Sequence, residues 1–557
     1  MSSSRLKAFS KEAKAKNTKK EPQLDSADDY LEAASEHEDA MGKHRAGDAA
    51  KALRFAHRAL EVYSNGVAKF PQNFDLAYNK AWLELEVATH DSLAEALDVP
   101  VIGLLRQALE SHRIALGLNS DNADALFNMA QVLTAIAEKI AEDDGADDSE
   151  ALQCLEQAID YQNQCFQIQE REFTKNRREF EQAMHGSADN DPDNDGGARR
   201  TQNTAYPASA NQDEEEDQWV SVVEPVTANS LLDTVIAQIN TLATLCSIIN
   251  SQLAATPGLA PPISMSWVES FSTKLLAGVL PNLIDENKED LGPRLSEMAL
   301  TKAVFVGNFL ELSFRSGAND VDTYQKELDS AFKQPEVDAT SEDVLLAWAR
   351  ALIAFNSALA DSDSQQANSD AGGVPQQTQA SLRWSVLIDA QSRLTATAKL
   401  PHISASKDHD DTRTLTTTHL LRGDISLLLQ ALSYPPTAHI QARNTAGQLL
   451  KNAEVYYRNA GKLFGTLGSD AREEKAVCEL KGGVVAVLQQ LIADATSAGS
   501  SSSTADSSAS NLSTASPQLM ESGLGAVARA KGEAWVREQL DDLVAEGLIL
   551  PQVFGLQ

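Results

Sequence analysis

The sequence predicts an all-α protein in which antiparallel helix pairs stack into a solenoid. Apolar residues recur at helical spacing over most of the chain, and no run of β-branched residues alternates as in a strand. One stretch shows the helical spacing well, with apolar residues at Leu231, Leu232, Val235, Ile236, Ile239, Leu242 and Leu245. One local pattern also occurs twice, at 71–81 and at 120–130, which favours repeated helical units.

The charge of the chain argues against two classes of partner. Among 557 residues, 47 are Lys or Arg and 80 are Asp or Glu, which gives a formal net charge of −33. Nucleic acids and anionic membranes are bound mainly through Lys and Arg, so neither is an expected partner. The hydrophobic share of 42% also argues against a chain that is disordered throughout.

Cysteine usage and the first residues predict the compartment. The four cysteines, Cys154, Cys165, Cys246 and Cys478, form no CxxC pair, which favours buried, reduced thiols. The basic N-terminus lacks the apolar stretch of a secretory signal, and no uninterrupted apolar run reaches membrane-spanning length. We therefore expect a soluble protein that is cytoplasmic, nuclear or both.

Polar tracts divide the chain into blocks. Residues 1–24 are interpreted as a disordered basic leader, with a nuclear-import or RNA-contacting tail as the alternative. Further disordered linkers are predicted at 186–217, which is acidic, at 361–378, and at 497–517, which is rich in Ser. Helical repeats are then expected at 25–185, degenerate repeats at 218–360 and 379–496, and a C-terminal helix at 518–557.

Helix boundaries have local signals. Ser26 followed by acidic residues predicts a helix start, as does Ser341 before Glu342 and Asp343. Gly423 and Gly461 are interpreted as lying at or near helix ends or turns. Gly482 and Gly483 lie within a helical pattern, which favours a kink or a tight helix crossing over a phosphate-binding loop.

The repeated pattern resembles the junction between successive tetratricopeptide (TPR) repeats. Both copies read [P/S]-x-N-x-D-x-apolar-aromatic-N-x-A, from Pro71 to Ala81 and from Ser120 to Ala130. Small residues of the preceding helices also fit the family, at Ala52, Ala56 and Ala59, at Ala108 and Ala115, and at Ala151 and Ala158. The likeness covers 33–160, with units that are longer than the 34 residues of the family.

The resemblance implies a concave surface lined by the first helix of each repeat. The positions that it places there are Tyr78, Asn79, Trp82, Phe127, Asn128 and Gln131. Packing within the fold is the alternative role of these residues. The carboxylate clamp that some family members use for chaperone C-termini is not expected, because the third such helix, 123–142, has no Lys or Arg before Lys139.

No motif predicts a catalytic, cofactor-binding or metal-binding site. Residues 191–196 resemble the start of an EF-hand loop, but its twelfth position is Gln202 instead of Glu. His402 and His409, the latter beside Asp408, Asp410 and Asp411, are interpreted as members of a polar loop rather than a zinc site. Nucleophile-elbow and phosphate-loop signatures are missing from the sequence, so we expect no enzyme and no cofactor.

These observations predict a non-catalytic scaffold or adaptor that binds protein segments through the concave face of a TPR-like solenoid. The alternative is an acidic assembly chaperone that escorts a basic client such as a ribosomal protein or a histone. Protein partners, basic ones among them, are expected in either case. The sequence identifies neither the partner nor the oligomeric state.

Overall fold

The computed structural model of the chain describes residues 24–45, 47–94, 96–97, 99–142, 148–186, 225–256, 265–367, 376–405, 408–435, 437–467, 471–499 and 514–556. Within these ranges every regular element is a helix and no strand occurs. The prediction of an all-α protein is confirmed. The predicted leader up to residue 23, the acidic linker from residue 187 onward and most of the Ser-rich linker lie outside the described residues.

The first half of the chain forms long helices joined by short turns. They are α1 (Ala27–His44), α2 (Ala49–Lys69), α3 (Phe74–Thr89), α4 (Asp91–Ala94), α5 (Val101–Leu118), α6 (Ala123–Ala141), α7 (Asp148–Gly186) and α8 (Ala228–Ala255). Next come α9 (Met265–Thr273), the π-helix η1 (Lys274–Val279), α10 (Leu280–Glu286), α11 (Lys288–Leu291), the 3₁₀-helix η2 (Gly292–Arg294) and α12 (Leu295–Arg315).

The second half continues in the same style. It comprises α13 (Val321–Phe332), α14 (Glu342–Ala367), α15 (Gln376–Thr397), α16 (Pro401–Ala405), α17 (His409–Ala431), α18 (Ile440–Phe464) and α19 (Arg472–Gly499). The chain closes with α20 (Pro517–Lys531), α21 (Glu533–Ala545) and α22 (Pro551–Phe554).

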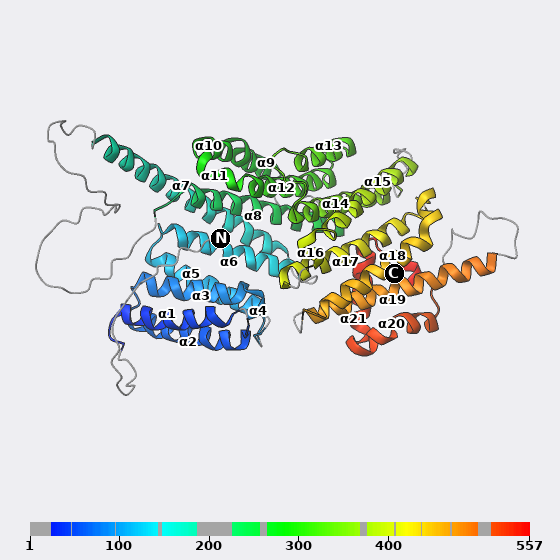
Figure 1. Cartoon of the computed structure of the whole chain (residues 1–557), viewed down its shortest axis with the longest axis horizontal. Helices are drawn as coiled ribbons and strands as arrows, with labels where there is room; N and C mark the ends of the chain where they lie inside the picture. Colours follow the sequence, from blue (N-terminus) through cyan, green and yellow to red (C-terminus); the bar gives the residue numbers. More distant parts are fainter. Residues whose placement is uncertain are drawn as a thin grey trace, which may run out of the picture.

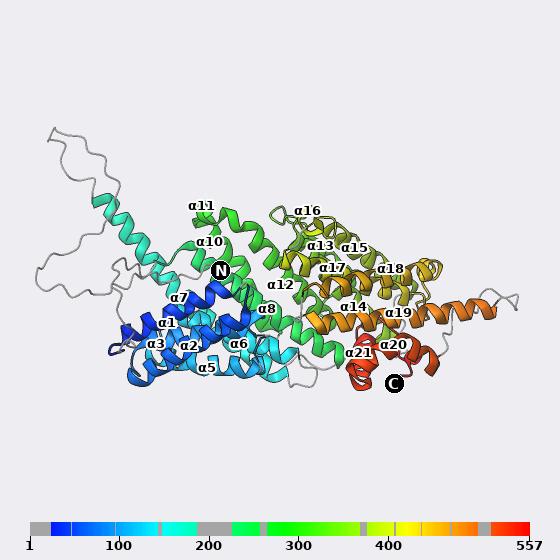
Figure 2. The same cartoon turned by 60° about the horizontal axis from the view of Figure 1, so that its bottom comes forward.

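The long helices pack on their neighbours in the chain. Contacts run from α1 on α2 through α6 on α7, α8 on α12 and α14 on α15 to α20 on α21. Figure 1 shows this progression, with the blue helices at one end of the long axis and the red helices at the other. The view in Figure 2 keeps the same order. In the first part, alternate helices touch as well, because α3 contacts both α1 and α6, and α6 contacts α8.

The core consists of successive clusters that share helices. On α3, Leu83 and Val87 belong to the first cluster, whereas Leu85 and Ala88 belong to the second. On α12, Phe305 belongs to the second cluster and Ala303 to the third. Each of these helices therefore buries apolar residues on two opposite sides, as expected for an interior layer of a stack.

Two helix starts follow the sequence signals. The Ser26 side chain accepts a hydrogen bond from the backbone N–H of Asp29, and the Asp29 carboxylate accepts one from the backbone N–H of Ser26 at 2.8 Å. This reciprocal pair is a capping box. Helix α14 begins at Glu342, directly after Ser341. Both starts agree with the prediction.

The positions predicted for three glycines can be compared with the structure. Gly423 lies inside α17 rather than in a turn. A Cβ at this position would overlap the ring edge of Tyr457 from α18, which explains why the residue is glycine. Gly461 lies in the last turn of α18, three residues before its end at Phe464, so it is near a helix end as predicted. The tight crossing predicted at Gly483 is present, since a Cβ there would overlap the carbonyl oxygen of Gly523 in α20.

The linker predicted at 361–378 overlaps two helices. Helix α14 continues to Ala367 and α15 begins at Gln376, which leaves only 368–375 outside the described residues. Asp361 pairs with Arg315 of α12 at 2.6 Å, and Asp363 pairs with Arg383 of α15 at 3.3 Å. These polar residues look like a linker by composition, but they are held by ion pairs to neighbouring helices.

The predicted C-terminal helix is divided into three. Gly532, between α20 and α21, has φ +101°, which side-chain-bearing residues rarely adopt. Gly547 likewise has φ +71° after α21. These two glycines break a helical sequence pattern that is otherwise continuous.

Three helical segments are long and apolar enough to cross a membrane, by length and composition. They are Ala228–Ala255, Glu342–Ser364 and Arg472–Asp494, and polar residues interrupt the apolar runs in each of them. Within the structure, 72%, 50% and 56% of their apolar windows are buried against other parts of the chain. Much of this apolar surface therefore serves the packing of the helices.

Candidate functional site

The two copies of the repeated pattern fold in the same way. Asn73 precedes α3 and Asn122 precedes α6, with φ and ψ of −85° and 114° in one case and −82° and 114° in the other. Each Asn side chain accepts a hydrogen bond from a backbone N–H in the first turn, at 2.9 Å from Leu76 and 2.8 Å from Ala125. The first Asn of the pattern is therefore the N-cap of the helix that follows.

The structure brings Tyr78 and Asn128 together across α3 and α6. The Nδ2 amide of Asn128 donates a hydrogen bond of 3.0 Å to the Tyr78 hydroxyl. Asn128 is buried, and Tyr78 stacks on Phe74 with ring centroids 5.5 Å apart. Burial, together with the charge of Asp124, raises the pKa of the Tyr78 hydroxyl. Equivalent helices of two successive units thus meet through a neutral hydrogen bond.

The other predicted site residues are distributed over this region. Trp82 is partly buried against the first core cluster, which α1 and α2 also build. Phe127 packs with Cys165 and Ile168 of α7. Asn79 and Gln131 are partly exposed on α3 and α6. Trp82 and Phe127 therefore pack against different neighbours, and five of the six residues keep some exposed surface.

A buried polar cluster between α3 and α5 was not predicted. Lys80 donates through Nζ to Glu84 at 2.7 Å and to Ser111 at 2.9 Å, and Gln107 donates to the same Glu84 oxygen at 2.8 Å. The spacing of Lys80 and Glu84 by four residues was the sequence signal for this ion pair. Because Glu84 is 5% exposed, the cluster joins the two helices rather than facing solvent.

His112 is a packing residue on α5, next to this cluster. It is fully buried, and its Nδ1 lies 2.9 Å from the Ala108 carbonyl oxygen. That bond requires the hydrogen on Nδ1, because a carbonyl oxygen can only accept. Burial lowers the pKa of His112, which favours the neutral ring.

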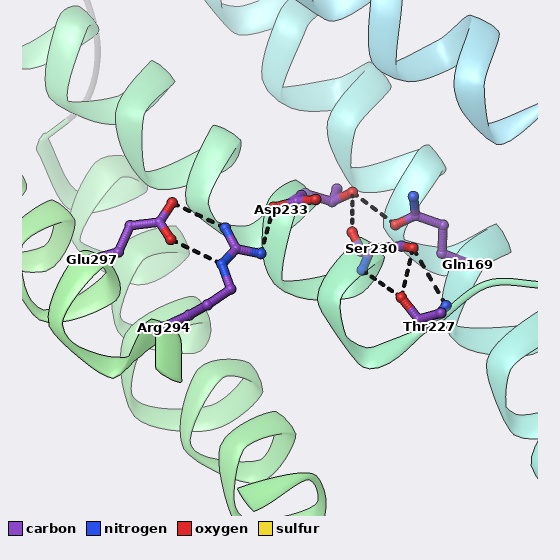
Figure 3. Close-up of polar contacts among 7 residues, drawn as sticks. Gln169, Thr227, Ser230, Asp233, Arg294 and Glu297 are labelled. Atoms are coloured by element: carbon purple, nitrogen blue, oxygen red, sulfur yellow. Dashed lines mark hydrogen bonds and ion pairs between the residues drawn. The ribbon is translucent and has the colours of Figure 1, made fainter. Parts of the chain in front are cut away.

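A second polar network fixes α8 to both of its neighbours (Figure 3). On one side, Thr234 donates to the Gln169 side chain of α7 at 2.7 Å. On the other side, Arg294 pairs with Asp233 at 2.6 Å and binds both carboxylate oxygens of Glu297 at 2.9 and 3.0 Å. Since both carboxylates hold the guanidinium, this network is a structural link between α8 and the start of α12.

Within the described part of the chain, no three His, Cys, Asp or Glu residues gather as a metal site would require. His402 pairs with Glu342 at 2.8 Å, and His409 lies 3.7 Å from Asp410. The calcium-loop resemblance at 191–196 lies outside the described residues. All four cysteines are buried and unpaired, as predicted.

These features define an all-helical protein in which most helices pack on the helices next to them in the chain. Its candidate interaction surface lies on α3 and α6. No family model matches the chain. The UPF0656 protein C926.02 of Schizosaccharomyces pombe is 34% identical over 150 residues, which cover 26% of this chain and 32% of that protein. The match thus spans about a third of the length of that curated relative.

Among solved structures, the chain was matched to a circular tandem repeat protein with novel repeat topology and enhanced subunit contact surfaces. The comparison covers 93% of this chain and 98% of the other, at 13% sequence identity and a TM-score of 0.24. A TM-score this low does not establish a shared fold.

Proposed function

We propose that the chain is a TPR-like, non-catalytic scaffold that binds protein segments through a concave face on its first repeats. The two matched junctions and their Asn caps support the repeat assignment. The contacts of α3 with both α1 and α6, and of α6 with α8, support it further. In stacked helix pairs, the first helices of successive units lie side by side and line one surface.

The hydrogen bond between Tyr78 and Asn128 is the observation that carries this proposal. It joins the resembling positions of two successive units, which supports a shared surface on α3 and α6. Tyr78, Asn79 and Trp82 on α3, and Phe127 and Gln131 on α6, are each partly exposed. Aromatic and amide groups on a rigid surface are suited to hold a peptide through its side chains and backbone.

The net charge of −33 favours a second candidate function. An acidic assembly chaperone would shield a basic client, such as a ribosomal protein or a histone, until that client reaches its site of use. We place this protein in the cytoplasm, the nucleus or both, without nucleic acid or membrane as a partner. The two functions differ in the physical nature of the contact, which is apolar and hydrogen-bonded in the first and electrostatic in the second.

Affinity purification with mass spectrometry at low and high salt tests both candidates. Exposed charges are screened within about 8 Å at physiological ionic strength, so a shielding contact weakens steeply as salt rises. A partner that is bound to the concave face through apolar contacts and hydrogen bonds should be recovered at both salt concentrations. Loss of every partner at high salt would favour the chaperone function over the scaffold.

A double substitution locates the surface. Tyr78→Ala with Phe127→Ala is expected to lose the partners recovered by the unaltered chain. The matched control is Phe180→Ala with Ile440→Ala, which removes two side chains that are 67% and 70% exposed outside α3 and α6. If the first variant melts at the same temperature as the unaltered chain and still recovers the same partners, the proposed face is not the binding surface.

A further inference from the structure

A groove lies at the far end of α3 and α6, apart from the Tyr78–Asn128 contact. It encloses about 310 Å³, and its apolar lining includes Ala88, Val101, Leu105 and Ala135. Helix α3 reaches it at Ala88, ten residues beyond Tyr78, and α6 reaches it at Ala135, seven residues beyond Asn128. Seven to ten residues of α-helix span about 10–15 Å, so this groove is a separate place on the molecule.

The open space has a local cause. Helix α3 ends at Thr89 and α5 begins at Val101, and the one helix described between them is the four-residue α4. The residues around the opening include Ala88 and Ala135, whose methyl groups fill little volume. Ala88 and Leu105 are buried in the floor, whereas Val101 and Ala135 are partly exposed and make the floor reachable. The groove therefore offers apolar surface to an entering side chain.

The rim of the groove is acidic and incompletely neutralised. Glu138 and Glu142 both line it, and Lys139 pairs with Glu142 at 2.5 Å. The Glu138 side chain is exposed, and among the described residues no hydrogen bond or ion pair holds its carboxylate. Partial desolvation and the like charge of Glu142 raise the pKa of Glu138. A cation at this carboxylate would relieve both effects.

We propose that this groove is a second docking site for a protein partner, and that it takes a short segment with an apolar side chain beside Lys or Arg. The apolar side chain lies over Ala88 and Ala135, and the cation pairs with Glu138. The site goes beyond the proposed function, because it involves none of the residues of the α3–α6 face around Tyr78. Its charge complementarity selects basic segments and rejects acidic ones.

The test uses the full chain with ¹³C-labelled Ala, Val and Leu methyl groups, observed by NMR. The probe is a short acetylated peptide in which one Leu stands between Arg and Lys. We expect the methyl signals of Ala88, Val101, Leu105 and Ala135 to shift. The shifts should reach their limit at a peptide concentration of about 1 mM or below. The same peptide with Glu in place of Arg and Lys should shift none of them. No shift with the basic peptide, or equal shifts with both peptides, would overturn the proposal.

Three variants refine the test. Ala135→Phe fills the groove and should abolish the shifts at Ala88 and Leu105, and Glu138→Gln should weaken peptide binding about threefold or more. The matched control is Glu156→Gln, which removes one exposed carboxylate from α7 outside the groove. Equal weakening by Glu156→Gln and Glu138→Gln would mean general attraction to an acidic surface, and the groove would be rejected. If Ala135→Phe does not fold, the comparison of the two Gln variants decides.

The proposed function and this second site can be tested separately. A chain with Tyr78→Ala and Phe127→Ala should keep the peptide-induced shifts at the groove, whatever partners it loses. Loss of those shifts in a folded double variant would show that the groove depends on the other surface, and it would contradict a separate docking site.

Discussion

Gly483 of α19 and Gly523 of α20 face each other at a helix crossing that leaves no room for a side chain. A Cβ added at Gly483 would overlap the Gly523 carbonyl oxygen, and one at Gly523 would lie 2.8 Å from the Gly483 carbonyl oxygen. Because these are backbone atoms, the overlap can be relieved only by moving one helix away from the other. This crossing holds the last three helices against the rest of the third core cluster.

Gly483→Ala should therefore destabilise the protein by about 1–3 kcal/mol, the usual cost of overpacking. Gly482→Ala is the matched control, since a Cβ there meets no atom within 4 Å. Alanine also has the higher helix propensity, so the control should be neutral or stabilising by up to about 1 kcal/mol. Urea unfolding of both variants measures the difference. Equal stabilities would show that the two helices do not approach so closely.

The Tyr78–Asn128 hydrogen bond should appear as a coupling energy. We expect a double-mutant cycle of Tyr78→Phe and Asn128→Ala to give a coupling of about 0.5–1.5 kcal/mol. Denaturant unfolding of the unaltered chain, the two single variants and the double variant supplies the four corners of the cycle. Additive effects would mean that the two units are not joined at this point.

The packing of α5 can be tested with a buried charge. Ala115 is fully buried, whereas its neighbour Ile114 is 47% exposed. Ala115→Glu should cost about 3 kcal/mol or more, because it places an unpaired carboxylate between helices. Ile114→Glu introduces the same charge on the exposed side and should change stability little. A melting temperature unchanged by Ala115→Glu would refute the assigned packing.

His419 should make stability depend on pH. Burial and the nearby Arg422 charge lower its pKa from 6.5 to about 4. As pH falls below about 6.5, the unfolded chain takes up a proton that the folded chain does not, so stability falls from pH 6.5 toward pH 4. His419→Gln should lose less stability over this range than the unaltered chain.

An NMR titration of the His419 ring provides the direct measurement. A midpoint near 4 agrees with the half-buried position beside Tyr456, whose ring stacks on the imidazole with centroids 6.2 Å apart. A midpoint at or above 6.5 would contradict the environment that the structure gives this ring.

The sequence predicted the parts of the fold that depend on local chemistry. The helix start at Ser26 follows from side-chain capping, which involves residues only a few positions apart, and α14 begins directly after Ser341 as its sequence signal predicted. The repeated pattern located the starts of α3 and α6, because its Asn residues act as caps in both copies. The tight crossing at Gly483 is one of the two structures predicted for the paired glycines, the other being a kink, since glycines within a helical pattern permit the close approach of a second backbone.

The wrong predictions involve contacts between distant residues. Gly423 was assigned to a turn because glycine often ends helices, but its partner is Tyr457 on the next helix, 34 positions later. Asp361 and Asp363 were assigned to a linker by composition, although Arg315 and Arg383 hold them in place. The groove near Glu138 could not be predicted, because it depends on where separate helices end relative to one another.

The double-sided burial on α3 and α12 limits how this chain can be divided. A fragment that ends after α3 would expose Leu85 and Ala88 to solvent. A fragment that begins at α12 would likewise expose Phe305. Neither piece would be an autonomous body, because each would lack the layer that covers its end. Designed shorter versions should therefore carry polar capping helices at every new terminus.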